Sequence, residues 1–103
     1  MTLDEYQLKA AETDLGAEVD YYIHGLSSEA GEVAAYRKRA LRGDADCGDL
    51  IGELGDVLWY LAAVADMYGV QLSNVAEYNL TKLRKRKEAG TIAGSGENRG
   101  ALL

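Results

Sequence analysis

The sequence predicts an all-α fold, and three observations carry that prediction. The 103 residues include no proline and no phenylalanine. Long stretches are rich in alanine, leucine, glutamate and lysine, which are strong helix formers. Apolar residues recur at helical spacing in four segments that are separated by glycine-containing turns. Because only glycine interrupts helices in the body of the chain, strands have little support.

The first two helices are defined by signals at their ends. Thr2 and Glu5 have the spacing of a capping box, so a first helix is expected to begin there and to run for about 13 residues, until Gly16. A second helix is expected over residues 20–41, and Gly43 is expected to end it. The apolar stripe of this second helix consists of Ile23, Leu26, Ala30, Val33, Ala34 and Leu41.

The third and fourth helices each follow a polar turn. Asp46 or Asp49 is expected to cap a third helix that extends to Tyr68, and Ser73 to cap a fourth that ends shortly before Gly90. Beyond that glycine the sequence is glycine-rich, has no helical pattern and is expected to form a flexible tail. The residues expected to face a core are Leu50, Leu54, Val57, Leu61 and Val64 in the third helix and Val75, Ala76, Leu80 and Leu83 in the fourth.

Charge and composition limit the classes of function. The formal net charge of −6 counts against binding to DNA or RNA, because an acidic surface repels phosphate backbones, although one basic run extends from Lys82 to Lys87. The single cysteine, Cys47, excludes an intrachain disulfide and fits a reducing compartment. No signal peptide or membrane-length apolar stretch is recognisable. We therefore expect a cytoplasmic protein with neither membrane nor nucleic-acid partners.

A short acidic pattern occurs twice. Glu29 and Glu32 lie three residues apart in the second helix, and Glu53 and Asp56 do so in the third. Residues at this spacing share a helix face, so two helices could bring four carboxylates to one point. Such a cluster either raises the pKa values of its members or holds a hard divalent cation, and oxygen ligands alone favour Mg²⁺ or Mn²⁺. The only histidine, His24, lacks the Glu-x-x-His spacing of di-iron bundles. The alternative is four separate surface charges.

Two glycines lie inside the acidic turns, Gly31 in the second helix and Gly55 in the third. A glycine within a helix costs about 1 kcal/mol relative to alanine, so something is expected to offset that cost. One interpretation is a close approach of the two helices, which would let the flanking acids converge. The other is ordinary tight helix packing.

A polar face is predicted on the fourth helix. Asn79, Lys82 and Arg86 fall on one side of it, and together they could contact phosphate or sugar groups opposite the acids. The alternative is that they form surface salt bridges with Glu77 or Glu88.

Two aromatic residues, Trp59 and Tyr60, follow the second acidic pair by one helical turn. Such a ring could stack on a nucleobase. Aromatic residues at this spacing are more often part of a core or of a subunit interface, and the sequence leaves both interpretations open.

The combination of these features resembles a known family. Glu29-x-x-Glu32, 20 intervening residues and Glu53-x-x-Asp56 are similar to the signature of MazG-like nucleoside triphosphate pyrophosphohydrolases. Similar stretches also include Asn79-Leu80-x-Lys82-Leu83 and Gly94-Ser95-Gly96-Glu97-Asn98-Arg99. The resemblance extends over most of the chain and includes short, phage-encoded, single-domain members.

The resemblance implies a fold, an assembly and a reaction. Residues 1–90 would form a four-helix-bundle-like catalytic domain and residues 91–103 a glycine-rich tail. The assembly would be a homodimer or a dimer of dimers with active sites between subunits. The reaction would be the Mg²⁺-dependent cleavage of a nucleoside triphosphate to the monophosphate and pyrophosphate, with Mn²⁺ as a substitute. We expect a deoxynucleotide substrate and a cytoplasmic location, in the host cytoplasm if the protein is phage-encoded.

Roles for individual residues follow from the same resemblance. The family's metal-binding and catalytic acids correspond to Glu29, Glu32, Glu53 and Asp56. Its phosphate or sugar contacts correspond to Lys82, with Asn79 and Arg86. Trp59 and Tyr60 are not part of this correspondence; their position beside the second acid pair makes them candidates for the base contact.

Two rival functions remain open. One is a phosphoribosyl-ATP pyrophosphohydrolase, which resembles this superfamily in its fold and its acid pairs. The other is a non-catalytic helical oligomer that serves as a regulatory module and whose acids are only surface charges.

Overall fold

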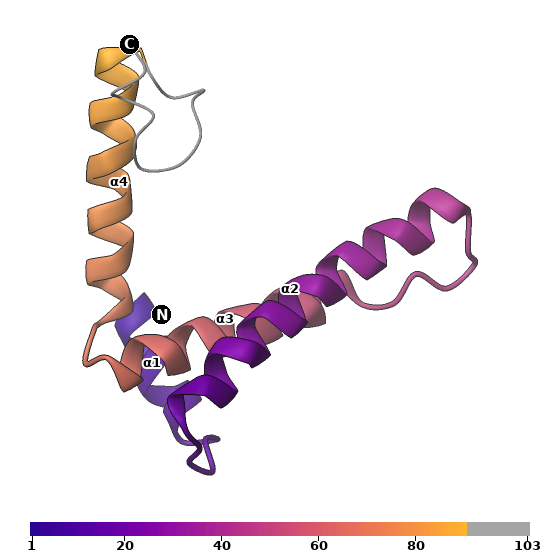
Figure 1. Ribbon diagram of the computed structural model, residues 1–103, viewed down its shortest axis with the longest axis horizontal. Coiled ribbons are helices and arrows are strands. Elements are labelled where there is room, and N and C mark those ends of the chain that lie inside the picture. Colours follow the sequence, from indigo (N-terminus) through magenta and orange to yellow (C-terminus); the bar gives the residue numbers. More distant parts are fainter. Residues whose placement is uncertain (91–103) are drawn as a thin grey trace.

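The computed structural model describes residues 1–90, and these residues form four helices and no strand (Figure 1). In chain order the helices are α1 (Leu3–Ala11), α2 (Val19–Arg42), α3 (Leu50–Met67) and α4 (Leu72–Ala89). The expected all-α, four-helix architecture is confirmed. The predicted glycine-rich tail, residues 91–103, lies outside the described residues. Within residues 1–90, no helix is both long enough and apolar enough to cross a bilayer.

Helices α2 and α3 run side by side as an antiparallel hairpin, which is the largest contact between helices in the structure (Figure 1). Helix α2 ends at Gly43, which adopts a left-handed conformation (φ 84°). Arg39 then fixes the connecting loop by donating a hydrogen bond from Nε to the carbonyl of Cys47 at 2.9 Å. Of the two predicted caps for α3, the structure selects Asp49, whose carboxylate accepts a bond from the N–H of Gly52 at 3.1 Å.

Helix α1 begins with the predicted capping box, in which Thr2 and Glu5 accept each other's backbone N–H groups. It ends at Ala11, several residues earlier than expected. The early end has a local cause, because Thr13 and Asp14 use their side chains to form a turn. The Thr13 hydroxyl donates to the carbonyl of Ala10 at 2.7 Å, and the Asp14 carboxylate accepts from the N–H of Gly16 at 2.9 Å.

The N-terminus of α4 is capped by α1 rather than by its own sequence. Gln7, only 5% exposed, accepts the N–H of Leu72 at 2.9 Å. Asp4 accepts the N–H and the hydroxyl of Ser73 at 2.9 and 2.7 Å. The prediction that Ser73 caps α4 is wrong, since the N-cap position belongs to Gln71. The first-turn N–H groups already have partners from another helix, so a local cap is not needed.

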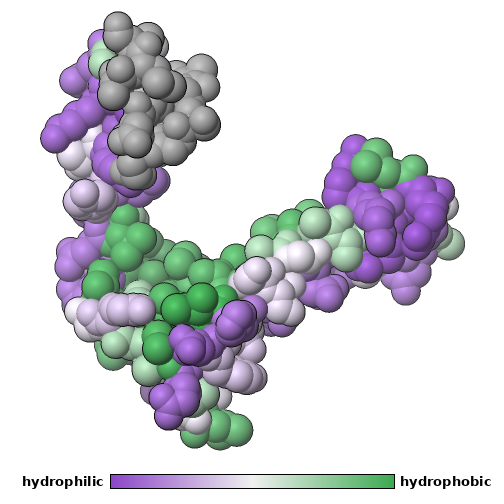
Figure 2. Space-filling view, viewed as in Figure 1, coloured by the Kyte–Doolittle hydropathy of each residue, from purple (hydrophilic) through white to green (hydrophobic). Residues whose placement is uncertain are grey.

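The core of a single chain is small. The buried apolar residues are Tyr22, Ala62, Ala63, Ala65 and Leu72. Several residues that were expected to face a core are exposed instead, including Leu41 (70%), Leu54 (51%) and Leu80 (54%). Helix α4 packs mainly on α1 and points away from the α2–α3 hairpin, so the four helices form an open angle (Figure 1). Figure 2 shows apolar surface gathered on the inner side of that angle.

Candidate metal centre

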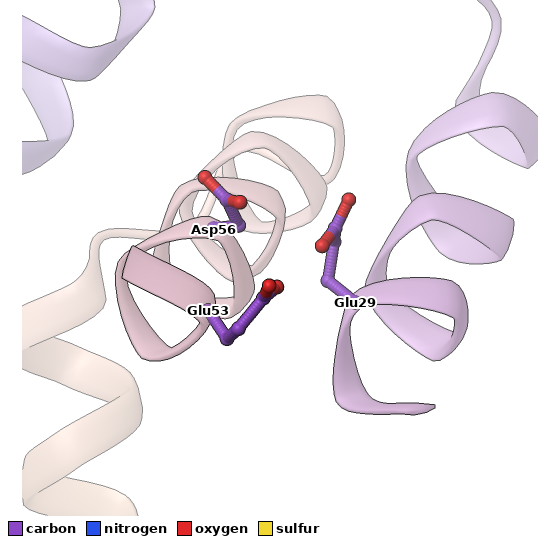
Figure 3. A group of neighbouring side chains, drawn as sticks. All are labelled: Glu29, Glu53 and Asp56. Atoms are coloured by element: carbon purple, nitrogen blue, oxygen red, sulfur yellow. The ribbon is translucent and has the colours of Figure 1, made fainter. Parts of the chain in front are cut away.

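Three carboxylates meet between α2 and α3. Helix α2 contributes Glu29, and α3 contributes Glu53 and Asp56, which lie one turn apart on the same face. One oxygen of each residue lies within 4.8 Å of the others. Figure 3 shows the Glu29 side chain in the gap between the two helices, with the side chains of Glu53 and Asp56 beside it. One acid of the first pair and both acids of the second therefore converge, whereas the repeated pattern predicts that all four do.

The position of Glu29 is electrostatically unfavourable without a counter-charge. The pKa of its carboxyl is raised above the usual 4.5, first by desolvation and then by the negative charges of Asp56, Glu53 and Glu32. A cation between these groups would reverse that effect, because it favours the ionised form of every carboxylate around it.

The donor set fits a small divalent ion. All three groups are carboxylates, which suit Mg²⁺ or Mn²⁺, and no histidine or cysteine belongs to the cluster. Metal–oxygen distances of about 2.1 Å place the ligands of one octahedral ion within roughly 3 to 4.2 Å of each other, so small side-chain rotations would complete the site. Asp56 is exposed, so that side of the group is open to water or to a substrate oxygen.

The fourth predicted acid stands apart from this group. Glu32 is exposed on α2 and is not among the three residues whose oxygens converge, although its charge acts on Glu29. It lies one turn further along α2 than Glu29, at the edge of the cluster.

The predicted cationic face lies on α4, and within one chain α4 is directed away from the acids (Figure 1). Asn79 and Lys82 line a groove of about 390 Å³ together with Val70, Asn74, Val75 and Tyr78. The Lys82 ammonium lies 5.4 Å from the centre of the Tyr78 ring. Arg86 is half-buried further along α4. One chain alone does not bring these residues onto the carboxylates.

The predicted base-binding residues belong to an aromatic cluster beside the acids. The Trp59 ring lies 5.0 Å from that of Tyr60 and 6.2 Å from that of Tyr22, measured between centroids. Its indole N–H donates to the Thr13 hydroxyl at 2.8 Å, and the Tyr22 hydroxyl donates to Asp14 at 2.6 Å.

Trp59 and Tyr22 border a second cavity, which was not expected from the sequence. It has a volume of about 370 Å³ and is lined by residues 13–17 with Tyr21, Tyr22 and Trp59. The only sequence signal for it was the Asp14-x-Gly16 spacing, which is typical of a turn stabilised by an aspartate side chain.

The structure corrects the interpretation of the glycines. A Cβ atom at Gly31 or Gly55 would meet nothing within 4 Å, so α2 and α3 do not approach closely at those positions within one chain. The close approach is at Gly25, where a Cβ would lie 2.1 Å from Cε1 of Tyr60. Gly25 was not singled out from the sequence, because a lone glycine in a helix gives no information about which neighbour faces it.

Comparison with known proteins assigns the family. Residues 18–91 match the family model of the MazG nucleotide pyrophosphohydrolase domain. The chain belongs to this family. The MazG match includes α2, α3 and α4, and therefore Glu29, Glu32, Glu53 and Asp56.

Two relatives are similar to this MazG chain. The Gene 37 protein of Mycobacterium phage L5 is 43% identical over 115 aligned residues, which cover 96% of this chain and all of the phage protein. The uncharacterized protein YvdC of Bacillus subtilis (strain 168) is 50% identical over 40 residues, which cover 39% of this chain and 38% of that protein. No solved structure matches the chain.

Proposed function

We propose that this MazG chain hydrolyses a nucleoside triphosphate, with a deoxynucleotide as the expected substrate, to the monophosphate and pyrophosphate in a reaction that depends on Mg²⁺ or Mn²⁺. The observation that carries the proposal is the convergence of Glu29, Glu53 and Asp56 within 4.8 Å. The family assignment supports the same reaction class.

The three carboxylates would hold the ion, with Glu32 available at the edge of the cluster. When bound, a divalent ion supplies neutralisation of the phosphate charge and a lower pKa for a bound water. In the hydrolysis, a water oxygen bonds to phosphorus as the bridging α–β P–O bond breaks, and one carboxylate accepts the water proton. The leaving pyrophosphate carries away the electron pair of the broken bond.

Charge on the leaving group needs cations, and the candidates are Lys82 and Arg86, with Asn79 as a polar contact. Because α4 points away from the acids of its own chain, we propose that a second copy brings this face to the site in a homodimer or a dimer of dimers. The small core and the exposed apolar residues of α3 and α4 support such an assembly.

The base contact is proposed at the aromatic cluster. Trp59 and Tyr60 lie one turn beyond Asp56 on α3, and the adjoining cavity of about 370 Å³ offers aromatic walls together with the polar groups of Thr13 and Asp14. This arrangement suits a flat heterocycle held at one end of a triphosphate. We also propose that the protein acts in the cytoplasm, where nucleotides and Mg²⁺ are available.

The test is a pyrophosphate-release assay over the eight common ribo- and deoxyribonucleoside triphosphates, modified nucleotides and phosphoribosyl-ATP, with Mg²⁺, Mn²⁺ or EDTA. Glu53→Gln and Asp56→Asn are expected to lose activity by on the order of 100-fold or more. The control is Glu12→Gln, a change at an exposed glutamate that precedes both acid pairs in the sequence, and it should keep the activity. Retained activity in EDTA, or in either cluster variant, would contradict the proposal. Preference for phosphoribosyl-ATP would favour the first rival function.

Calorimetric titration with Mn²⁺ in the absence of nucleotide distinguishes the proposed enzyme from the second rival, the non-catalytic helical module. A non-catalytic helical module predicts no specific metal binding. The proposed site predicts saturable binding that Asp56→Asn weakens.

A further inference from the structure

The converging acids and the contact between Gly25 and Tyr60 lie on the facing surfaces of α2 and α3. On α2, Gly25 and Glu29 lie four residues apart, and on α3, Asp56 and Tyr60 do so, so each pair shares one face of its helix. Because the two helices are antiparallel, a step from Gly25 to Glu29 runs in the same direction as a step from Tyr60 to Asp56. The contact of Tyr60 with Gly25 therefore lies one helical turn from the converging carboxylates.

The Tyr60 ring occupies the space where a side chain at position 25 would begin. A Cβ at Gly25 would lie 2.1, 2.5 and 2.6 Å from Cε1, Cδ1 and Cζ of that ring, far inside van der Waals contact. Among the glycines of residues 1–90, this is the position where a ring from another helix replaces the missing side chain. The ring therefore sets how closely α2 and α3 approach beside Glu29.

The ring cannot easily move away to accept a larger neighbour. Its ring packs nearly perpendicular to the ring of Trp59, with the centroids 5.0 Å apart, and the centroid of the Tyr21 ring lies 6.2 Å away. Trp59 is in turn fixed by its bond to Thr13. Since two aromatic rings pack against Tyr60, a side chain at position 25 would push α2 and α3 apart instead of displacing the ring.

The hydroxyl of Tyr60 also lies within electrostatic reach of the metal centre. Its pKa is raised to about 12, first by the hydrogen bond with Tyr21, then by desolvation and by the negative charges of Tyr21, Glu29 and Asp56. The contact and the carboxylates are thus parts of one continuous region of the hairpin.

We propose that the Gly25–Tyr60 contact positions Glu29 against Glu53 and Asp56, which makes both partners positioning residues for the divalent-ion site. The inference rests on the proposed metal-dependent function. It adds that the affinity for the ion depends on the spacing between α2 and α3, which the Gly25–Tyr60 contact sets one helical turn away from the carboxylates.

The experiment is calorimetric titration of the full chain with Mn²⁺ alone, without nucleotide, with circular dichroism to follow folding. Gly25→Ala is expected to weaken Mn²⁺ binding by roughly 10-fold, the scale seen for changes behind metal ligands. The matched control is Gly31→Ala, the same substitution in the same helix where a Cβ meets nothing within 4 Å. This control should keep the affinity of the unaltered chain. Equal Mn²⁺ affinity in Gly25→Ala and the unaltered chain would overturn the inference.

Two variants of the partner residue keep the test decisive if Gly25→Ala does not fold. Tyr60→Leu removes the ring and is expected to weaken Mn²⁺ binding by a similar factor, while Tyr60→Phe keeps the ring and should restore most of the affinity. Loss in both variants would assign the effect to the hydroxyl and refute a role for ring packing. In the Tyr60→Leu background, adding Gly25→Ala should cost little more, because the clash is gone.

Failure of the proposed function has a different signature. If the unaltered chain binds no Mn²⁺, the metal-dependent function fails and the inference fails with it. If the unaltered chain binds Mn²⁺ and Gly25→Ala binds it equally well, only the positioning role fails.

Discussion

Gln7 of α1 accepts a hydrogen bond from the N–H of Leu72, the first residue of α4, across 65 positions of sequence at a distance of 2.9 Å. The same side chain donates to Asp66 at 2.7 Å and to the carbonyl of Val70 at 2.9 Å. One buried amide therefore joins the N-terminal helix, the end of α3 and the start of α4. These bonds are among the few long-range polar contacts that hold α4 in place.

Gln7→Ala should destabilise the protein by about 2–3 kcal/mol, because three hydrogen bonds are lost and buried partners are left unsatisfied. Urea unfolding followed by circular dichroism measures the effect. Gln71→Ala is the matched control, since Gln71 is exposed and its side chain makes no capping bond. Equal stability of the two variants would argue that Gln7 does not fasten α4.

Glu29→Gln should stabilise the metal-free protein near neutral pH. The folded-state pKa of Glu29 is raised above 4.5, so the folded state binds a proton more tightly than the unfolded state and loses stability as pH rises through the raised pKa. An uncharged glutamine avoids that loss, and its advantage should disappear below about pH 4. Thermal unfolding in EDTA at both pH values tests the sign. A melting temperature that falls on substitution at neutral pH would contradict it.

The same variant should respond less to metal. Mn²⁺ should raise the melting temperature of the unaltered protein at neutral pH by binding the folded state, and the increase should be smaller at low pH, where protons compete for the carboxylates. Glu29→Gln should show a reduced increase at neutral pH. An increase that does not depend on pH or on Glu29 would place the ion elsewhere.

Val75→Glu should shift the protein toward monomers. Val75 is 39% exposed and lines the groove on α4, so a carboxylate there would oppose the burial of this surface in the proposed assembly. Sedimentation velocity over a range of concentrations measures the shift, and Gln71→Glu adds the same charge outside the groove as a control. If the unaltered chain sediments as a monomer throughout, the assembly proposal is wrong.

Nucleotide binding should change the fluorescence of Trp59, the single tryptophan of the chain. Its ring lines the cavity of about 370 Å³, so a base stacked there would quench its emission. Titration with a non-hydrolysable triphosphate analogue and Mg²⁺ provides the signal, and free triphosphate (inorganic) is the control that lacks a base. Equal responses to both would mean that the base lies away from Trp59.

Features that depend on neighbouring residues were predictable from the sequence. The capping box at Thr2 and Glu5 and the end of α2 at Gly43 are each settled within a few residues, and both were correctly expected. Asp49, the cap of α3, was one of two expected candidates. The convergence of Glu29 on α3 was also expected, because a repeated i, i+3 pattern on two joined helices has few other arrangements.

Features that depend on distant partners were not predictable. Ser73 resembles a cap, yet side chains from α1 satisfy the start of α4. The sequence suggested a close approach of the helices at Gly31 and Gly55, yet the contact is at Gly25. The orientation of the Tyr60 ring decides which glycine it packs against, and the sequence does not reveal that orientation. The amphipathic stripe of α4 gives no information about what covers it.

The fit of a tyrosine ring against a bare backbone has an evolutionary consequence. A side chain at position 25 and a full ring at position 60 exclude each other sterically. Among homologous chains, the two positions should therefore vary together, with a large residue at 60 accompanying glycine at 25 and a small one tolerating alanine. A substitution selected at one of the two positions would therefore be accompanied by a compensating substitution at the other.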